Sequence, residues 1–160
     1  MTVVVMGVSG SGKTTVAVAI AQRLGVPFQE GDSLHSPESI AKMSAGIPLD
    51  DADRAPWLAR VRDWIEQHPD GVITCSALKR AYRDELRVPG VRFLCLVAPR
   101  EVLLERLEHR TGHYMHADML DSQLATFEPP SPDETDVVEL DDTAPPDQVV
   151  AAALAALDAR

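Results

Sequence analysis

The sequence predicts an α/β protein: a three-layer sandwich in which helices cover both faces of a five-stranded parallel sheet. Its 160 residues match the usual size of one domain, so residues 1–160 are expected to form a single unit. Short β-branched runs alternate with helical stretches, the pattern of strands joined by crossover helices. Several of these runs are continuously apolar, as expected for strands buried on both faces.

The expected elements alternate along the whole chain. The valine-rich start of the chain forms the first strand, and the full set of strands is Thr2–Met6, Pro27–Glu30, Gly71–Cys75, Arg92–Val97 and Asp136–Leu140. The helices expected between and after them are Lys13–Leu24, Pro37–Ala45, Asp53–His68, Lys79–Arg87, Arg100–His109 and Pro145–Ala159. Gly25 and Pro69 follow two of these helices and are typical of residues that end a helix.

The composition excludes several classes of protein. Hydrophobic residues make up 45% and charged residues 25% of the chain, which excludes global disorder. The formal net charge of −10 argues against binding nucleic acid or an anionic membrane over a broad face. Nine of the 25 acids but only one of the 15 Lys and Arg residues lie from Glu128 onward, so the surplus acid is mainly C-terminal. A small anionic ligand is therefore not excluded, because a local pocket can oppose the global charge.

Several features favour the cytoplasm. No apolar run approaches the roughly 18 residues of a membrane span, and the chain starts with a strand pattern instead of a basic leader. Cys75 and Cys95 lie within apolar runs, which favours reduced, buried thiols. The chain contains no asparagine, so it has no N-glycosylation site.

A phosphate-binding loop follows the first strand. The segment Gly7-Val8-Ser9-Gly10-Ser11-Gly12-Lys13-Thr14 fits the pattern G-x-x-x-x-G-K-[ST], between a predicted strand and a predicted helix. Glycines let backbone N–H groups converge on phosphates, Lys13 supplies a cation, and Thr14 offers a hydroxyl to Mg²⁺. A guanine-specific Asn-Lys-x-Asp motif is absent, since the chain has no asparagine. The length favours a small phosphotransferase that uses ATP and Mg²⁺.

Polar residues after the second strand are candidates for the acceptor side. Ligands bind at the carboxyl ends of strands in such sheets, so Asp32 is expected to face the same crevice as the phosphate-binding loop. Its carboxylate could orient or deprotonate an acceptor hydroxyl, or hold Mg²⁺ through water. Taken alone, Asp32 could equally cap a helix, and His35 could make a structural polar contact.

Two basic clusters follow the third and fourth strands. Lys79, Arg80 and Arg83 fall within about one helical turn and could bind a carboxylate or a phosphoryl group, or form a solvated face. Arg106 and Arg110 are four residues apart and could neutralise transition-state charge, with the same solvated alternative. The loop before the last helix contains Pro146, which could pack against adenine or simply start the helix.

The chain resembles the small bacterial-type gluconokinases over nearly its whole length. The segments that carry the resemblance are Gly31-Asp32-Ser33-Leu34-His35, Lys42-Met43, Gly46-Ile47-Pro48-Leu49-Asp50-Asp51, Asp53-Arg54-Ala55-Pro56-Trp57-Leu58, Cys75-Ser76-Ala77-Leu78-Lys79-Arg80-Ala81-Tyr82-Arg83-Asp84, and Gly112-His113-Tyr114-Met115 with Ser122-Gln123. The chain departs from the usual family pattern at Ser36 and Ser39, where Pro and Asn are usual, and at Tyr114 and Leu124, where Phe is usual.

The resemblance implies transfer of the γ-phosphate of ATP to the 6-hydroxyl of D-gluconate. It also implies the nucleoside-monophosphate-kinase-like form of the sandwich, with a short lid at approximately residues 110–128. The family often dimerises, which leaves a homodimer open. A related shikimate- or nucleoside-type kinase is the main alternative, and a nucleotide-binding regulator that hydrolyses little is a second. A nucleic-acid kinase is disfavoured, because the basic groups are confined to one cleft.

The motif and the resemblance together assign roles to individual residues. The catalytic candidates are Lys13, Asp32 and Arg110, and Thr14 is the candidate metal ligand. The residues expected to bind ATP are Gly7, Val8, Ser9, Gly10, Ser11, Gly12, Lys13, Thr14, Thr15, Arg106, Arg110 and Pro146. The residues expected to bind gluconate are Asp32, His35, Arg54, Lys79, Arg83, His113 and Gln123.

Overall fold

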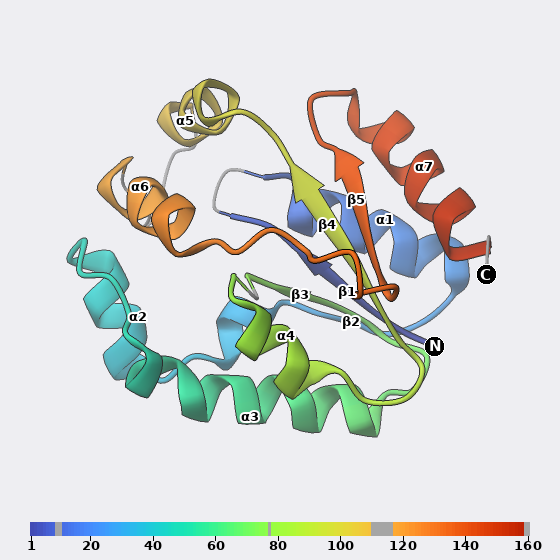
Figure 1. Cartoon of the computed structure of the whole chain (residues 1–160), viewed down its shortest axis with the longest axis horizontal. Coiled ribbons are helices and arrows are strands. Elements are labelled where there is room, and N and C mark those ends of the chain that lie inside the picture. The colour runs from blue at the N-terminus through green and yellow to red at the C-terminus, as the bar shows by residue number, and fades with distance from the viewer. Residues whose placement is uncertain (9–10, 77, 110–116, 159–160) are drawn as a thin grey trace.

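The computed structural model describes residues 1–8, 11–76, 78–109 and 117–158, and shows a five-stranded sheet between two layers of helices (Figure 1). The strands are β1 (Thr2–Met6), β2 (Phe28–Gln29), β3 (Val72–Cys75), β4 (Val91–Val97) and β5 (Val137–Asp141). They pair in the order β2-β3-β1-β4-β5, and every pair is parallel. The predicted fold class is confirmed, with each strand within one residue of its expected bounds.

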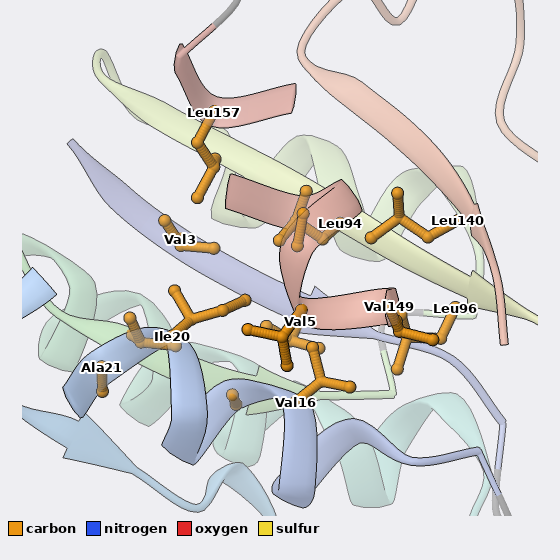
Figure 2. Close-up of a cluster of buried hydrophobic side chains, with 14 residues drawn as sticks. Val3, Val5, Val16, Ile20, Ala21, Leu94, Leu96, Leu140, Val149 and Leu157 are labelled. Atoms are coloured by element: carbon orange, nitrogen blue, oxygen red, sulfur yellow. The ribbon is translucent and has the colours of Figure 1, made fainter. Parts of the chain in front are cut away.

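Side chains of the central strand β1 alternate between the two faces of the sheet. On one face Val3 and Val5 pack beneath α1 (Lys13–Leu24) and α7 (Pro146–Asp158), in the cluster that Figure 2 shows. Val16 and Ile20 come from α1, and Val149 and Leu157 from α7. All four are nearly fully buried, so this face of the sheet is sealed by apolar contact.

The other face of the sheet is covered by α3 (Asp51–Gln67) and α4 (Arg80–Leu86). Trp57 and Val61 from α3 and Leu86 from α4 pack against Val4 and other strand residues of this face. The α3 helix begins with a capping box: Asp50 accepts a hydrogen bond from the Asp53 N–H, and the Asp53 carboxylate accepts one from the Asp50 N–H. This cap explains why α3 starts two residues before the predicted Asp53.

The remaining helices gather at the carboxyl end of the sheet, on the left of Figure 1. They are the short 3₁₀ helix η1 (Gly31–Leu34) and the α-helices α2 (Pro37–Ser44), α5 (Arg100–Glu108) and α6 (Ala117–Thr126). Ser36 caps α2, because its side chain accepts a hydrogen bond from the Ser39 N–H. The departure from the family pattern at Ser36 thus still gives a capped helix.

The expected lid falls partly outside the described residues, which omit 110–116. Its later part contains α6, a helix that the sequence analysis did not predict. Leu120 of α6 is buried with Leu103 and Leu107 of α5 and with Val8 of the phosphate-binding loop. These contacts connect α5 and α6 to the loop. None of the helices within the described ranges is both long enough and apolar enough to cross a membrane.

Candidate active site

The described part of the phosphate-binding loop joins β1 to α1 in a tight turn. Gly7 has a φ of +154°, and a Cβ there would lie 2.8 Å from Ser11 Oγ and 3.0 Å from the Leu96 carbonyl oxygen. A side chain at Gly7 would therefore disturb the turn. The Ser11 hydroxyl donates a hydrogen bond to the Val8 carbonyl (2.6 Å), and Lys13 Nζ donates to the Gly7 carbonyl (2.9 Å). The cation of Lys13 thus lies against the loop whose amides would bind phosphate.

Glu30 connects this loop to the acceptor side, and the sequence analysis did not identify it. One of its carboxylate oxygens accepts a hydrogen bond from the Thr14 hydroxyl (2.7 Å), and the other accepts one from the Thr74 hydroxyl (2.5 Å). Thr14 is the second residue of α1, Thr74 lies in β3, and Glu30 follows β2 directly. One carboxylate therefore joins three elements at the carboxyl end of the sheet.

Asp32 lies two residues beyond Glu30, in η1, and is partly exposed. No residue within the described ranges donates a hydrogen bond to its carboxylate. The backbone beneath it is fixed, since the Gly31 N–H donates to Thr74 Oγ1 (3.1 Å) and a Cβ at Gly31 would lie only 1.8 Å from the Thr74 carbonyl oxygen. Only glycine fits at position 31, so the Asp32 carboxylate is held on a loop that lies directly on β3.

His35 and Trp57 support the same loop. Their rings stack with centroids 4.2 Å apart, and Trp57 Nε1 donates a hydrogen bond to the Gly31 carbonyl (2.8 Å). Burial lowers the pKa of His35 to about 4, while the nearby charge of Asp32 opposes that shift and the charge of Arg54 adds to it. His35 is therefore neutral near pH 7. Its Nδ1 atom is buried without a hydrogen-bond partner among the described residues.

Arg54 and Lys79 meet at the ring of Tyr82. The Arg54 guanidinium carbon lies 5.7 Å and Lys79 Nζ 5.6 Å from the ring centroid. Arg54 also donates a hydrogen bond to the Tyr82 hydroxyl (3.2 Å), and Lys79 pairs with the Asp51 carboxylate (3.0 Å). Two predicted substrate residues are thus brought together. The cluster also contains Asp51 and Tyr82, to which the sequence analysis assigned no role.

The side chain of Arg83 lies in a buried ion pair, and its expected role in binding substrate stays a prediction. Arg83 and Glu134 both have fully buried side chains, and they form a paired contact through Nε (2.8 Å) and Nη2 (2.9 Å). Arg83 also donates to the Glu128 carbonyl (3.0 Å). The helix begins at Arg80, and Lys79 precedes it in an extended conformation, so Lys79 and Arg83 do not share a helical face. The Arg80 guanidinium donates two hydrogen bonds to the Asp133 carboxylate.

The Arg83–Glu134 pair gives a prediction about stability. Hydrogen bonds from Arg83 lower the pKa of Glu134 to about 2 from an ordinary value of 4.5. Glu134→Gln is expected to lower the free energy of unfolding by about 3 kcal/mol near pH 7, because it removes the carboxylate that pairs with the buried guanidinium of Arg83. A carboxyl with a lowered pKa stabilises the fold above its ordinary pKa, so the difference between wild type and variant should shrink as pH falls from 4.5 towards 2.

Urea unfolding of wild type and variant between pH 7 and pH 3 measures this difference. Asp133→Asn is the matched control, since Asp133 also pairs with an arginine of α4 but is 66% exposed, and the expected change is below about 1 kcal/mol. Equal effects of the two substitutions would show that burial of the Glu134 pair contributes nothing extra.

On the other side of the phosphate-binding loop, Arg106 is fixed by Asp142. The Asp142 carboxylate is buried and accepts hydrogen bonds from the Gly12 N–H (2.9 Å) and from Arg106 Nη1 (2.7 Å). Arg106 Nη2 also donates to the Asp142 carbonyl (2.6 Å). The sequence analysis did not assign Asp142. Pro146 begins α7 just beyond it and is exposed.

The other predicted site residues fall into two groups. Gln123 is buried on α6, and Thr15 is exposed in the first turn of α1. The predicted residues Ser9, Gly10, Arg110 and His113 lie outside the described residues. Among the described residues no cluster of three or more His, Cys, Asp or Glu side chains could hold a metal ion.

The known proteins to which this chain is similar in sequence are kinases. A family model described as shikimate kinase matches residues 9–158. The gluconokinase of Gluconobacter oxydans is 56% identical over 137 residues, which cover 82% of this chain and 77% of that protein.

Solved structures give the same result. A gluconokinase from Sinorhizobium meliloti superposes with a TM-score of 0.89 at 50% identity, covering 98% of this chain and 91% of that one. An unliganded sugar kinase from Janibacter superposes with a TM-score of 0.93 at 51% identity, covering 98% and 94%.

Proposed function

The chain belongs to the gluconokinases, within the shikimate kinase family of P-loop proteins, and from this premise we propose that it transfers the γ-phosphate of ATP to the 6-hydroxyl of D-gluconate. The products are 6-phospho-D-gluconate and ADP. The identity of over half to a gluconokinase across most of the chain supports gluconate over shikimate or a nucleoside as the acceptor. Although gluconate is an anion, the acidity of the outer surface does not exclude its binding, because the charges of the local pocket can oppose the global charge.

One observation carries the proposal most directly. The Glu30 carboxylate joins Thr14 of the phosphate-binding loop to the loop that presents Asp32, and the cations Arg54, on α3, and Lys79, just before α4, lie together at the ring of Tyr82. Gluconate has a hydroxyl at one end and a carboxylate at the other. A carboxylate base near the nucleotide, with a cationic cluster beyond it, matches both ends of such a molecule.

Each of three residues has a separate role in phosphoryl transfer. Asp32 accepts the proton of the 6-hydroxyl, whose oxygen forms the new bond to the γ-phosphorus while the bond to the bridging oxygen of ADP breaks. Lys13 leaves the loop carbonyls for the phosphates and offsets the charge that develops there. His35 is neutral near pH 7 and offers one ring N–H to a substrate hydroxyl.

The lid side closes the nucleotide site in this proposal. We assign residues 110–128 to a short lid, with Arg110 on the transferring phosphoryl group and His113 and Gln123 on gluconate. Arg106 lies beside the nucleotide, and Pro146, at the start of α7, lies against adenine. A closed lid excludes water, which would otherwise compete with gluconate for the phosphoryl group.

The residues present fit a magnesium ion. Thr14 and Glu30 offer a hydroxyl and a carboxylate, the oxygen donors that Mg²⁺ prefers, and they are already within hydrogen-bond distance of each other (2.7 Å). We assign Thr14 as a direct ligand and Glu30 as a residue that holds Thr14 or a metal-bound water. Bound Mg²⁺ would neutralise charge on the β- and γ-phosphates.

Glu30→Gln tests this assignment. The substitution removes the charged acceptor of the Thr14 hydroxyl, so the half-saturating concentration of free Mg²⁺ is expected to rise by about 10-fold at fixed ATP, with little change in the KM for gluconate. Initial rates across a Mg²⁺ titration measure the effect. Glu66→Gln, which removes an exposed acid from a pair with Arg62, is the control. An unchanged Mg²⁺ requirement with lower thermal stability would leave Glu30 as a structural brace only.

A panel of acceptors tests the proposed function itself. ADP release is measured in a coupled assay with gluconate, shikimate and nucleosides in turn, and only gluconate is expected to stimulate it strongly. Nucleotide binding without stimulation by any acceptor would favour a regulator instead of a kinase.

We place the reaction in the cytoplasm, where buried thiols such as Cys75 and Cys95 stay reduced.

A further inference from the structure

Tyr82 lies at the centre of the cluster that contains Arg54 and Lys79. Tyr82 is a residue of α4 that is only 6% exposed and belongs to the core cluster that also contains residues of α3, so its ring has a fixed position. The two cations lie at nearly equal distances from the ring centroid, 5.7 Å for the Arg54 guanidinium carbon and 5.6 Å for Lys79 Nζ. A rigid aromatic ring therefore sets the positions of two like charges that would otherwise repel each other.

The Tyr82 hydroxyl has one partner on each side. It donates a hydrogen bond to Asp51 Oδ1 and accepts one from Arg54 Nη1 (3.2 Å). A hydroxyl has a single proton, so donation to Asp51 leaves a lone pair for Arg54. The hydrogen bond from Tyr82 lowers the pKa of Asp51, as does the one from Lys79, so Asp51 is ionised near pH 7. Asp51 thus orients the hydroxyl, and the hydroxyl holds Arg54.

We propose that Tyr82 is a positioning residue for recognition of the substrate carboxylate, holding Arg54 through its hydroxyl so that Arg54 and Lys79 bind one carboxylate together. The inference rests on the proposed function and adds a residue and a substrate class to it. Tyr82 takes the place in this cluster that sequence spacing had given to Arg83, which is buried against Glu134.

The charge of the cluster indicates the class of acceptor. Arg54 and Lys79 contribute two positive charges and Asp51 one negative charge, so the cluster carries one net positive charge. A single carboxylate neutralises it. The cluster therefore selects sugar acids with one carboxylate at this end over neutral polyols and amides of the same shape, because only the acid brings a negative charge to the two cations.

Tyr82→Phe tests the proposal, because it keeps the ring and removes only the hydroxyl. The KM for gluconate is expected to rise about 10-fold, which is the effect of a lost hydrogen bond to a charged group, while the KM for ATP and the thermal stability stay close to wild type. D-gluconamide has the shape of gluconate without its charge. The ratio of kcat/KM for gluconate to kcat/KM for gluconamide should therefore fall about 10-fold as well.

A double-mutant cycle with Arg54→Ala separates positioning from packing. If Tyr82 acts through Arg54, Tyr82→Phe has no further effect on the gluconate KM once Arg54 is replaced. Fully additive effects, or equal losses with gluconate and gluconamide, would overturn the proposal. Arg62→Ala, which removes a cation elsewhere on α3, is the control and should leave all of these values unchanged. A wild-type protein that gluconate does not stimulate would instead refute the proposed function.

Discussion

Replacement of Asp32 with asparagine is expected to lower kcat for gluconate phosphorylation by at least about 100-fold, the usual contribution of a positioned general base. The amide keeps the size of the carboxylate but cannot accept the proton of the 6-hydroxyl. The loop beneath it should not move, because Gly31 is hydrogen-bonded to Thr74 and Trp57 independently of the Asp32 side chain. Steady-state kinetics measure the loss, and a nucleotide titration should show ATP binding close to wild type.

Asp70→Asn is the matched control for Asp32→Asn. Asp70 is 78% exposed and pairs with the N-terminal amine of Met1, on the side of the sheet away from the phosphate-binding loop. Its replacement should leave kcat unchanged. Turnover near the wild-type rate in the Asp32→Asn variant would remove Asp32 from the catalytic role and make it a residue that only lines the cleft.

Replacement of Arg54 with alanine is expected to raise the KM for gluconate by about 10- to 100-fold, because the substrate carboxylate loses a charge-assisted hydrogen bond. The values of kcat and of the KM for ATP should change much less, since Arg54 is proposed to contact the end of gluconate far from the reacting hydroxyl. Initial rates with gluconate and ATP varied separately distinguish these parameters.

Arg62→Ala again provides the comparison for Arg54→Ala. Arg62 lies on the same helix, pairs with Glu66 and donates a hydrogen bond to the Glu85 carbonyl, so its loss removes the same charge without touching the cluster. If Arg54→Ala instead leaves the gluconate KM unchanged and raises the KM for ATP, Arg54 belongs to the nucleotide side.

Local sequence patterns were sufficient for most of the fold. The valine run of β1 and the glycine-rich loop after it are determined by neighbouring residues, so their positions could be read directly from the chain. The helix α6 was missed, because its main apolar contacts, between Leu120 and α5, depend on tertiary packing. A helix of this kind is stabilised by its neighbours more than by its own sequence.

The contacts at the site that the sequence analysis missed have one common origin, which is partners distant in sequence. Arg83 pairs with Glu134, which is 51 residues away, and no helical spacing indicates that pairing. Glu30 was treated as the end of a strand, and its hydrogen bonds to Thr14 and Thr74 depend on the strand order. Asp142 was treated as part of a loop, although it is 130 residues from its partner Gly12. Local chemistry could be predicted in these cases, but the contacts between residues distant in sequence could not.

The contact at Gly31 has a consequence for how this protein could change during evolution. The carbonyl of Thr74 occupies the space of a side chain at position 31, so the loop that carries Asp32 cannot vary there without moving β3. The cluster of Arg54, Lys79 and Tyr82 is partly open and lies on α3 and at the start of α4, where single substitutions are accommodated more easily. New acceptor preferences, whether selected in nature or designed, should therefore arise through α3 and α4, while the machinery that activates the hydroxyl is inherited unchanged.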